Sequence, residues 1–159
     1  DRLGPRRGGA EKDRRGFQRT MTKIIEAPLE KLDETAEQIK EMLPEDTVIF
    51  LRGNLAAGKT TLTQALTRAK GCSSAVTSPT FSIQQVYDNG VAHYDLYQCP
   101  NEKFLAMGLL ESLEEPGWHL IEWGDEALEN LLRSHGFNVT VIEITPQEGS
   151  RRYKVETDA

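Results

Sequence analysis

The sequence predicts one three-layer α/β domain with a mostly parallel sheet, helices on both faces, an antiparallel hairpin and antiparallel C-terminal strands. Strand-like and helix-like segments alternate from residue 21 onward, which is typical of this class. Two short runs, TVIFL at 47–51 and HLIEW at 119–123, are apolar enough for strands buried on both faces. The length of 159 residues, with 38% hydrophobic, fits a single domain.

The first elements are predicted from apolar spacing. Residues 23–27 (KIIEA) are expected to form a short edge strand, and residues 29–43 have the helical spacing of an amphipathic helix. The β-branched run 47–51 is expected to be a central strand. Helical periodicity resumes over 61–70, and Gly71 is suited to end that helix.

The middle of the chain predicts a hairpin followed by a helix. Strand-like segments at 81–87 and 91–97 flank Asp88-Asn89-Gly90, and Asn-Gly is a strong signal for a hairpin. Residues 101–110 have helical spacing.

The last third predicts a buried strand, a helix and two further strands. The run 119–123 is the strand, and 125–133 is the helix, with Asp125 suited to its N-cap. Residues 139–145 and 152–157 are expected to be the final two strands.

Composition separates the first 20 residues from the rest. They carry a net charge of +4 and only three apolar residues, against −10 for residues 21–159. We therefore expect 1–20 to be a disordered leader, or an expression or upstream-translation remnant, and 21–159 to be the folded domain. An Arg-rich functional arm is the alternative.

Charge, cysteines and hydropathy limit the function. A domain this acidic repels a phosphate backbone, so any nucleic acid is expected to be met through a partner. Cys72 and Cys99 are far apart and form no metal-binding pattern, which favours a reducing compartment. The longest apolar runs are too short to span a membrane. A soluble, cytoplasmic protein without a membrane partner is expected.

The segment GNLAAGKTT, between the strand at 47–51 and the helix at 61–70, fits the phosphate-loop pattern GxxxxGKT. Such a loop turns its backbone N–H groups inward as an anion-binding nest at a helix N-terminus. The lysine reaches the β- and γ-phosphates, the first threonine is a Mg²⁺ ligand, and the second donates to the α-phosphate. The nucleotide-binding residues predicted from the loop are Asn54, Leu55, Ala56, Ala57, Gly58, Lys59, Thr60 and Thr61.

Two carboxylates are candidates to complete the site. Asp95 lies near the end of the second hairpin strand, and Glu122 lies at the end of the strand at 119–123. Together with Thr60 they are the predicted metal ligands for Mg²⁺, directly or through water. No Asn/Thr-Lys-x-Asp element follows the loop, so an adenine nucleotide, ATP or ADP, is expected rather than a guanine nucleotide.

The ordered motifs GNLAAGKTT, VTSPTF (76–81), HYDLYQ (93–98) and IEW (121–123) resemble those of the TsaE family, also called YjeE, over nearly all of residues 21–159. The resemblance implies a P-loop NTPase fold and a small bacterial ATPase required for threonylcarbamoyladenosine on tRNA. It implies that Thr80, in a switch-like loop, joins Lys59, Asp95 and Glu122 in catalysis. It also places Trp123 near the nucleotide, and it names TsaB and TsaD as partners through which tRNA is met.

The chain departs from the family pattern at two places. The loop has Asn54 and Ala56 where the family usually reads GDLGAGKT, and Gln98 replaces the arginine that usually follows DLY. Alanine at a positive φ would cost about 1 kcal/mol. These changes put loop mobility, affinity and an anion-binding role of position 98 in question.

Two other functions stay open from the sequence. A small P-loop kinase would pass the γ-phosphate to a metabolite or nucleotide, but it usually carries an Arg-rich lid. After residue 20 this chain has only five arginines: Arg52, Arg68, Arg133, Arg151 and Arg152. The third possibility is a nucleotide-dependent binding module. With so few candidates for an arginine finger, isolated hydrolysis is expected to be slow and to depend on a partner.

Overall fold

The structure is a computed structural model that describes residues 20–54, 57–73 and 83–158. The strands are β1 Thr20–Ala27, β2 Thr47–Arg52, β3 Gln84–Tyr87, β4 Val91–Asp95, β5 Trp118–Glu122, β6 Val139–Gln147 and β7 Ser150–Asp158. The helices are α1 Leu32–Met42, preceded by the 3-10 turn η1 Leu29–Lys31, α2 Lys59–Ala69, α3 Asn101–Ala106, α4 Leu109–Ser112 and α5 Glu126–Ser134.

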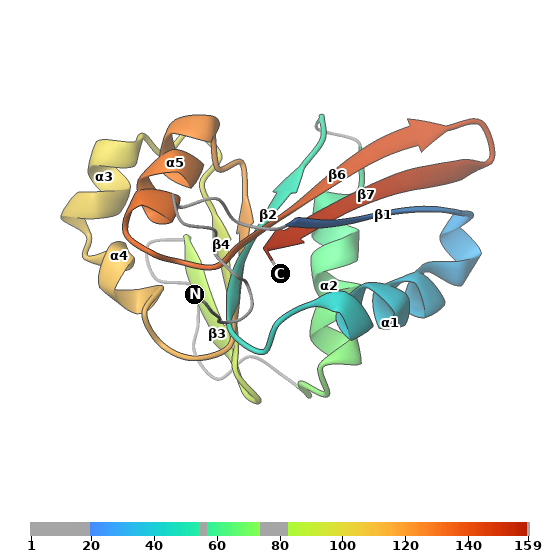
Figure 1. Cartoon of the computed structure of the whole chain (residues 1–159), viewed down its shortest axis with the longest axis horizontal. Coiled ribbons are helices and arrows are strands. Elements are labelled where there is room, and N and C mark those ends of the chain that lie inside the picture. The colour runs from blue at the N-terminus through green and yellow to red at the C-terminus, as the bar shows by residue number, and fades with distance from the viewer. Residues whose placement is uncertain (1–19, 55–56, 74–82, 159) are drawn as a thin grey trace, which may run out of the picture.

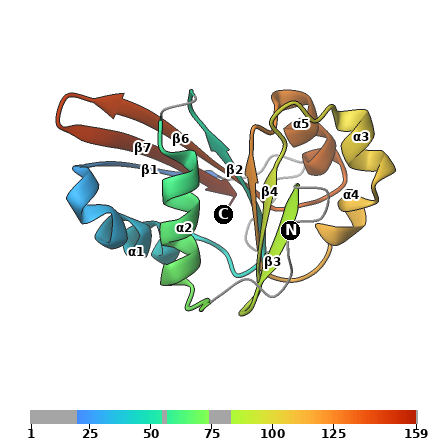
Figure 2. The same cartoon turned by 180° about the vertical axis from the view of Figure 1, so that it is seen from behind.

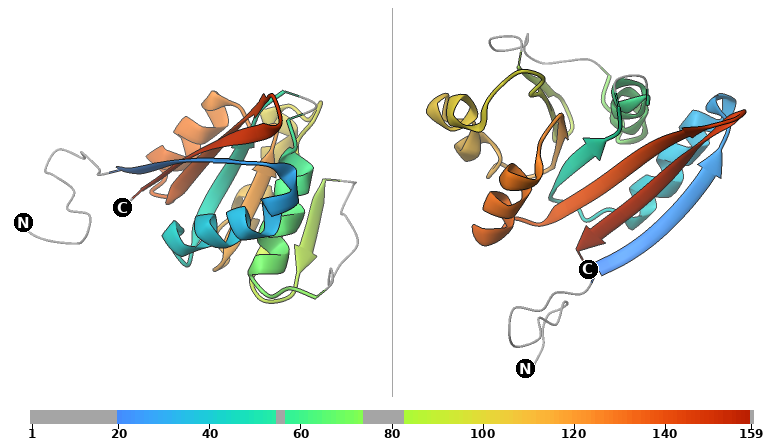
Figure 3. Two further views of the ribbon diagram at one scale, coloured as in Figure 1. Left: turned by 90° about the vertical axis from the view of Figure 1, so that its right-hand side faces the viewer. Right: turned by 90° about the horizontal axis from the view of Figure 1, so that it is seen from above.

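The described strands form one sheet in the order β1-β7-β6-β2-β5-β4-β3. The four central strands β6, β2, β5 and β4 run parallel, while β3 and β7 run antiparallel to their neighbours. The long hairpin of β6 and β7 and the edge strand β1 form one side of the sheet (Figure 3). The predicted mostly parallel sheet with antiparallel additions is therefore confirmed.

Helices cover both faces of the sheet, which confirms the predicted three layers. Helices α1 and α2 lie on one face, and α3, α4 and α5 lie on the other (Figures 1 and 2). Each face has its own apolar core, because the side chains of a buried strand alternate between the two faces. Ile49 and Leu51 of β2 pack toward α1 and α2, whereas Val48 and Phe50 pack toward the other helices.

Several element boundaries differ from the prediction. The helix expected over 101–110 is two short helices, because Gly108 adopts a left-handed conformation (φ +76°) between them. The edge strand begins at Thr20 rather than residue 23, because it pairs with β7 along its whole length. The second hairpin strand ends at Asp95, two residues earlier than expected.

Two local predictions are confirmed in detail. The predicted hairpin is present: Tyr87 pairs with Val91 across a three-residue loop, in which both Asn89 and Gly90 adopt a positive φ. Asp125 is the N-cap of α5, and its side chain accepts a hydrogen bond from Leu128 N at 2.9 Å. Among the described residues, no helix combines the length and apolarity needed to cross a membrane.

Candidate functional site

A pocket of about 410 Å³ lies where the parallel strands β2, β4 and β5 end and α2 begins. In an open α/β sheet, this edge is where ligands bind. The N-terminus of α2 faces the pocket, so unpaired backbone N–H groups and the positive end of the helix dipole are available to an anion. The lining residues are Gly58, Lys59, Thr60, Thr61, Asp95, Tyr97, Glu122, Trp123 and Arg151.

Two glycines shape the loop between β2 and α2. A Cβ on Gly53 would lie 2.7 Å from the Cβ of Ala57, so only glycine allows this close approach. Gly58 caps α2 in a left-handed conformation, with φ +103°. Because Gly58 already caps the helix, α2 starts at Lys59, two residues before the predicted start at Thr61. Leu55 and Ala56 lie outside the described residues.

Lys59 is buried, with 4% of its surface exposed, and its ammonium is held by the loop. Lys59 Nζ donates to Gly53 O at 2.7 Å and to Asn54 O at 2.9 Å. It also lies 3.9 Å from the centroid of the Trp123 ring. Burial lowers the pKa of Lys59, and the charges of Glu122 and Asp95 oppose that shift.

Glu122 is the centre of a hydrogen-bonded group at the other side of the pocket. Thr60 Oγ1 donates to Glu122 Oε1 at 2.9 Å, and His93 Nε2 lies 2.7 Å from Glu122 Oε2. Burial alone would raise the pKa of Glu122, but the hydrogen bonds with His93 and Thr60 and the charge of Lys59 hold it below its usual value. The carboxylate is therefore negatively charged at neutral pH.

Asp95 is brought beside Glu122 by the pairing of β4 with β5, in which the two residues are register partners. Asp95 is exposed, and its Oδ1 accepts a hydrogen bond from Tyr97 N at 3.1 Å. The Thr60 hydroxyl and these two carboxylates are the oxygen donors that Mg²⁺ prefers. In the described part of the chain, no three His, Cys, Asp or Glu side chains are grouped to hold a metal by themselves. The donor set therefore fits a Mg²⁺ ion shared with nucleotide phosphates.

Two aromatic side chains border the pocket. The Trp123 and Tyr97 rings have centroids 5.1 Å apart and an interplanar angle of 54°. Trp123 follows β5 with a positive φ of 66°, which is unusual for a bulky residue and costs of the order of 1–3 kcal/mol. The contacts with Lys59 and Tyr97 hold the ring in this position.

The structure thus brings together most of the predicted site residues that it describes. Lys59, Thr60, Thr61 and Trp123 line one pocket with the two predicted carboxylates. Asn54 contributes its carbonyl oxygen to Lys59, and Ala57, within the loop, is buried. Thr80 lies outside the described residues.

Two residues near this pocket lie outside the set of predicted site residues. The first is His93, which hydrogen-bonds the predicted site carboxylate Glu122. The second is Arg151, one of the five arginines after residue 20, which lines the pocket although no sequence motif predicts a site there. The alternation of side chains along β7 places Arg151 on the same face as Tyr153 and Val155. That it lies beside the loop between β2 and α2 follows only from the order of the strands in the sheet.

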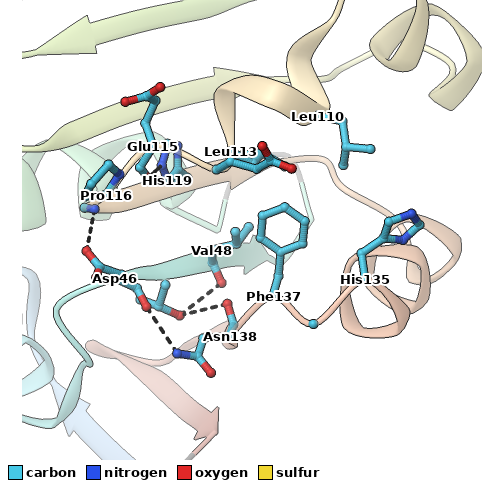
Figure 4. A pocket seen from close by; sticks show the side chains of 14 residues that line it. Asp46, Val48, Leu110, Leu113, Glu115, Pro116, His119, His135, Phe137 and Asn138 are labelled. Carbon is cyan, nitrogen blue, oxygen red and sulfur yellow. Dashed lines mark hydrogen bonds between the residues drawn. The ribbon is translucent and has the colours of Figure 1, made fainter.

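A further cavity, of about 390 Å³, lies at the opposite edge of the sheet (Figure 4). Three acidic residues line it, Asp46, Glu114 and Glu115. Both ring nitrogens of His119 have partners, because Nδ1 bonds Tyr94 Oη and Nε2 bonds Glu115 O. The acidic lining opposes phosphate binding, so the pocket at the α2 N-terminus is the candidate nucleotide site.

The buried strand, the glycine-shaped loop and the lysine at the start of α2 define a P-loop NTPase-like protein of the three-layer α/β class. A solved structure has the same architecture: the crystal structure of Bacillus subtilis YdiB matches with a TM-score of 0.58 and 23% identity, covering 87% of this chain and 88% of that chain.

Sequence comparisons place the chain within a family. The family model described as "Threonylcarbamoyl adenosine biosynthesis protein TsaE" matches residues 27–153. The protein named tRNA threonylcarbamoyladenosine biosynthesis protein TsaE from a Nostoc species is 32% identical to this chain, over 85% of each chain. The protein of that name from Treponema pallidum is also 32% identical, over 74% of this chain and 87% of the relative. The chain belongs to the TsaE family.

Proposed function

We propose that this protein binds Mg-ATP in the pocket at the start of α2 and hydrolyses it slowly to ADP and phosphate. The observation that carries the proposal is the joint position of Lys59 and Thr60 at the helix N-terminus, with Glu122 hydrogen-bonded to Thr60. We further propose that hydrolysis serves the biosynthesis of threonylcarbamoyladenosine on tRNA, the process for which its relatives are named.

Different residues of the pocket are proposed to bind different parts of Mg-ATP. The backbone N–H groups of the loop and of the first turn of α2 are the donors for the phosphate oxygens. Lys59 exchanges its loop carbonyls for the β- and γ-phosphates, and Thr61 donates to the α-phosphate. Thr60, Glu122 and Asp95 would hold Mg²⁺, which supplies charge neutralisation to the phosphate oxygens when bound.

Hydrolysis requires positioning of a water molecule rather than a covalent intermediate. Glu122 is a charged acceptor whose orientation is fixed by Thr60 and His93. We assign it the orientation of the attacking water or of the water shell around the metal. Thr80, in the switch-like segment, is proposed to approach the γ-phosphate.

The proposed setting is the cytoplasm, in a complex with TsaB and TsaD homologues. The two described cysteines are free thiols, in agreement with a reducing compartment. Residues 21–159 carry a charge of −10, so we propose that tRNA is met through the complex rather than through this domain alone.

The central test replaces the loop lysine. Lys59→Ala is expected to lower ATP turnover by about 100-fold or more, because it removes a preorganised cation from the phosphates. Calorimetric titration with Mg-ATP and phosphate release measure binding and turnover. Lys31→Ala, at an exposed lysine whose ammonium lies 3.8 Å from Glu34 Oε1, is the matched control. Unchanged binding and turnover in Lys59→Ala would refute the proposal.

A second experiment tests the setting of the reaction. Phosphate release is measured with the protein alone and with TsaB and TsaD homologues added, and a clear stimulation is expected. Equal rates would refute partner-dependent hydrolysis and favour a binding module whose hydrolysis is incidental. Transfer of labelled γ-phosphate to an added metabolite or nucleotide would instead establish a kinase.

A further inference from the structure

Arg151 enters the pocket from outside the phosphate loop. It is the second residue of β7, and it lines the pocket together with Gly58, Lys59 and Thr60. A Cβ placed on Gly58 would lie 2.6 Å from Arg151 Nη1 and 2.8 Å from Arg151 Cζ. The guanidinium therefore lies directly against the loop backbone that precedes α2.

The guanidinium has an unused donor at this position. Arg151 Nη1 is buried and has no hydrogen-bond partner among the described residues. A buried donor without a partner is costly, and such groups need an explanation in a native structure. Neither Asp95 nor Glu122 forms a salt bridge with Arg151, although both line the same pocket.

Three other arginines in the described part of the chain each form a salt bridge with an acidic residue. Arg52 pairs with Glu129 at 2.8 Å, Arg68 with Asp33 at 2.8 Å, and Arg133 with Asp158 at 2.9 Å. Arg151, in contrast, lies at an anion-binding helix terminus with a donor free for an incoming oxygen.

We propose that Arg151 is a phosphate-binding residue that acts in the same chain, through a charge-assisted hydrogen bond to the phosphates shared by ATP and ADP. This inference rests on the proposed function, because it presupposes a nucleotide in this pocket. The guanidinium already contacts the loop, so its contact with phosphate needs no movement of a partner. Arg151 contributes equally to the affinity for ATP and for ADP. Its loss should therefore raise KM and leave kcat unchanged.

The test compares Arg151→Ala, Arg151→Lys and Arg152→Ala by calorimetric titration with Mg-ADP and Mg-ATP. Arg151→Ala is expected to bind both nucleotides roughly 10- to 100-fold more weakly, the range for a hydrogen bond to a charged group. Arg151→Lys should recover part of the affinity, because lysine keeps the charge without the planar fork. Arg152 is exposed and points to the other face of β7, so Arg152→Ala should bind as the wild type does.

Thermal unfolding without nucleotide separates binding from a structural role. Arg151→Ala should unfold at the wild-type temperature or above it, because it removes a buried donor that has no described partner. Unchanged affinity for both nucleotides in Arg151→Ala overturns the inference, whether or not the unfolding temperature falls. A loss of turnover with both affinities intact also overturns it. A wild-type protein that binds neither nucleotide would refute the proposed function itself, and this inference with it.

Discussion

Glu122 is a single residue that contributes both to the stability of the fold and to the candidate site. Its carboxylate is buried at the end of β5, yet it contacts both the phosphate loop and β4 through Thr60 and His93. Burial opposes the charged form of Glu122, and the two hydrogen bonds and Lys59 more than offset that effect, so that its pKa lies below the usual value. A group whose pKa is lowered on folding stabilises the folded state above its unfolded pKa and loses that contribution as the pH falls.

Glu122→Gln is therefore expected to change the pH dependence of stability. The difference in free energy of unfolding between the wild type and this variant should be constant above about pH 4.5, the ordinary carboxyl value. It should shrink as the pH falls below that value through the folded pKa, because the wild-type carboxylate is then protonated. Urea denaturation at a series of pH values from 3 to 7 measures it.

A matched control for this experiment is Glu114→Gln, which removes one negative charge at an exposed position outside the pocket. A difference between the wild type and Glu122→Gln that does not vary with pH would contradict the assignment of a lowered pKa.

Residue types and spacing predicted one part of the site and left another unassigned. Lys59 and Thr60 were predictable because the loop pattern fixes their place relative to the strand before and the helix after. The contact of His93 with Glu122 depends on the pairing of β4 with β5, which local sequence does not encode. The strained backbone of Trp123 is likewise a product of its surroundings, because no local pattern favours a positive φ at tryptophan.

At the scale of elements, α5 depends on a cap that also connects it to α3. Asp125 Oδ1 accepts from Leu128 N at 2.9 Å and from Asn101 Nδ2 at 3.2 Å. The backbone hydrogen bond from Leu128, with a smaller contribution from Asn101, lowers the pKa of Asp125 although burial opposes the shift.

Asp125→Ala is expected to lower the free energy of unfolding by about 0.5–2 kcal/mol, the usual cost of losing an N-cap. Asp125→Asn keeps an oxygen acceptor and should retain most of the stability. Urea denaturation at neutral pH compares the three proteins. Equal destabilisation by alanine and asparagine would show that the charge, rather than the cap, is what matters.

Elements with a strong local signal were predicted well. The Asn89-Gly90 turn and the Asp125 cap are specified by residues that favour one backbone conformation or one hydrogen bond, so both were found from sequence. The helix expected over 101–110 was predicted as one piece because its apolar spacing continues across Gly108. The left-handed conformation of that glycine divides the segment into two helices.

At the scale of the molecule, a chain of charged groups connects β2, α5 and β7. Arg52 bonds Glu129, Glu129 bonds Arg133, and Arg133 bonds Asp158 at the end of β7. Asp158 also accepts from Val139 N at 3.0 Å, which fixes the start of β6. The same strand, β7, carries Arg151 at its other end.

Asp158→Ala is expected to lower the free energy of unfolding by about 1–3 kcal/mol, because it removes the acceptor of Arg133 Nη1 and of the buried Val139 N–H, while Arg133 keeps only its bond to Glu129. Asp158→Asn, which keeps one acceptor oxygen, should lose less. Urea denaturation measures the effect, and titration with Mg-ADP should show unchanged affinity because the pocket lies at the opposite end of β7. A weaker affinity would indicate that the strand transmits the change to the pocket.

The sheet order is the part of the architecture that the sequence left open. Buried strands and alternating strands were recognisable, but no local pattern states that β6 lies beside β2 or that β7 returns next to it. That order brings Arg151 next to Gly58. The position of Arg151 in the pocket could therefore not be predicted from the sequence.

The hydrogen bonds from Lys59 Nζ to its own loop make the loop carbonyls competitors of a ligand for the ammonium group. A nucleotide bound as proposed would have to replace the carbonyls of Gly53 and Asn54 as the partners of Lys59. Its affinity would then be the difference between two sets of contacts made by one side chain. A change that weakened only the internal set would tighten binding without adding any contact to the ligand.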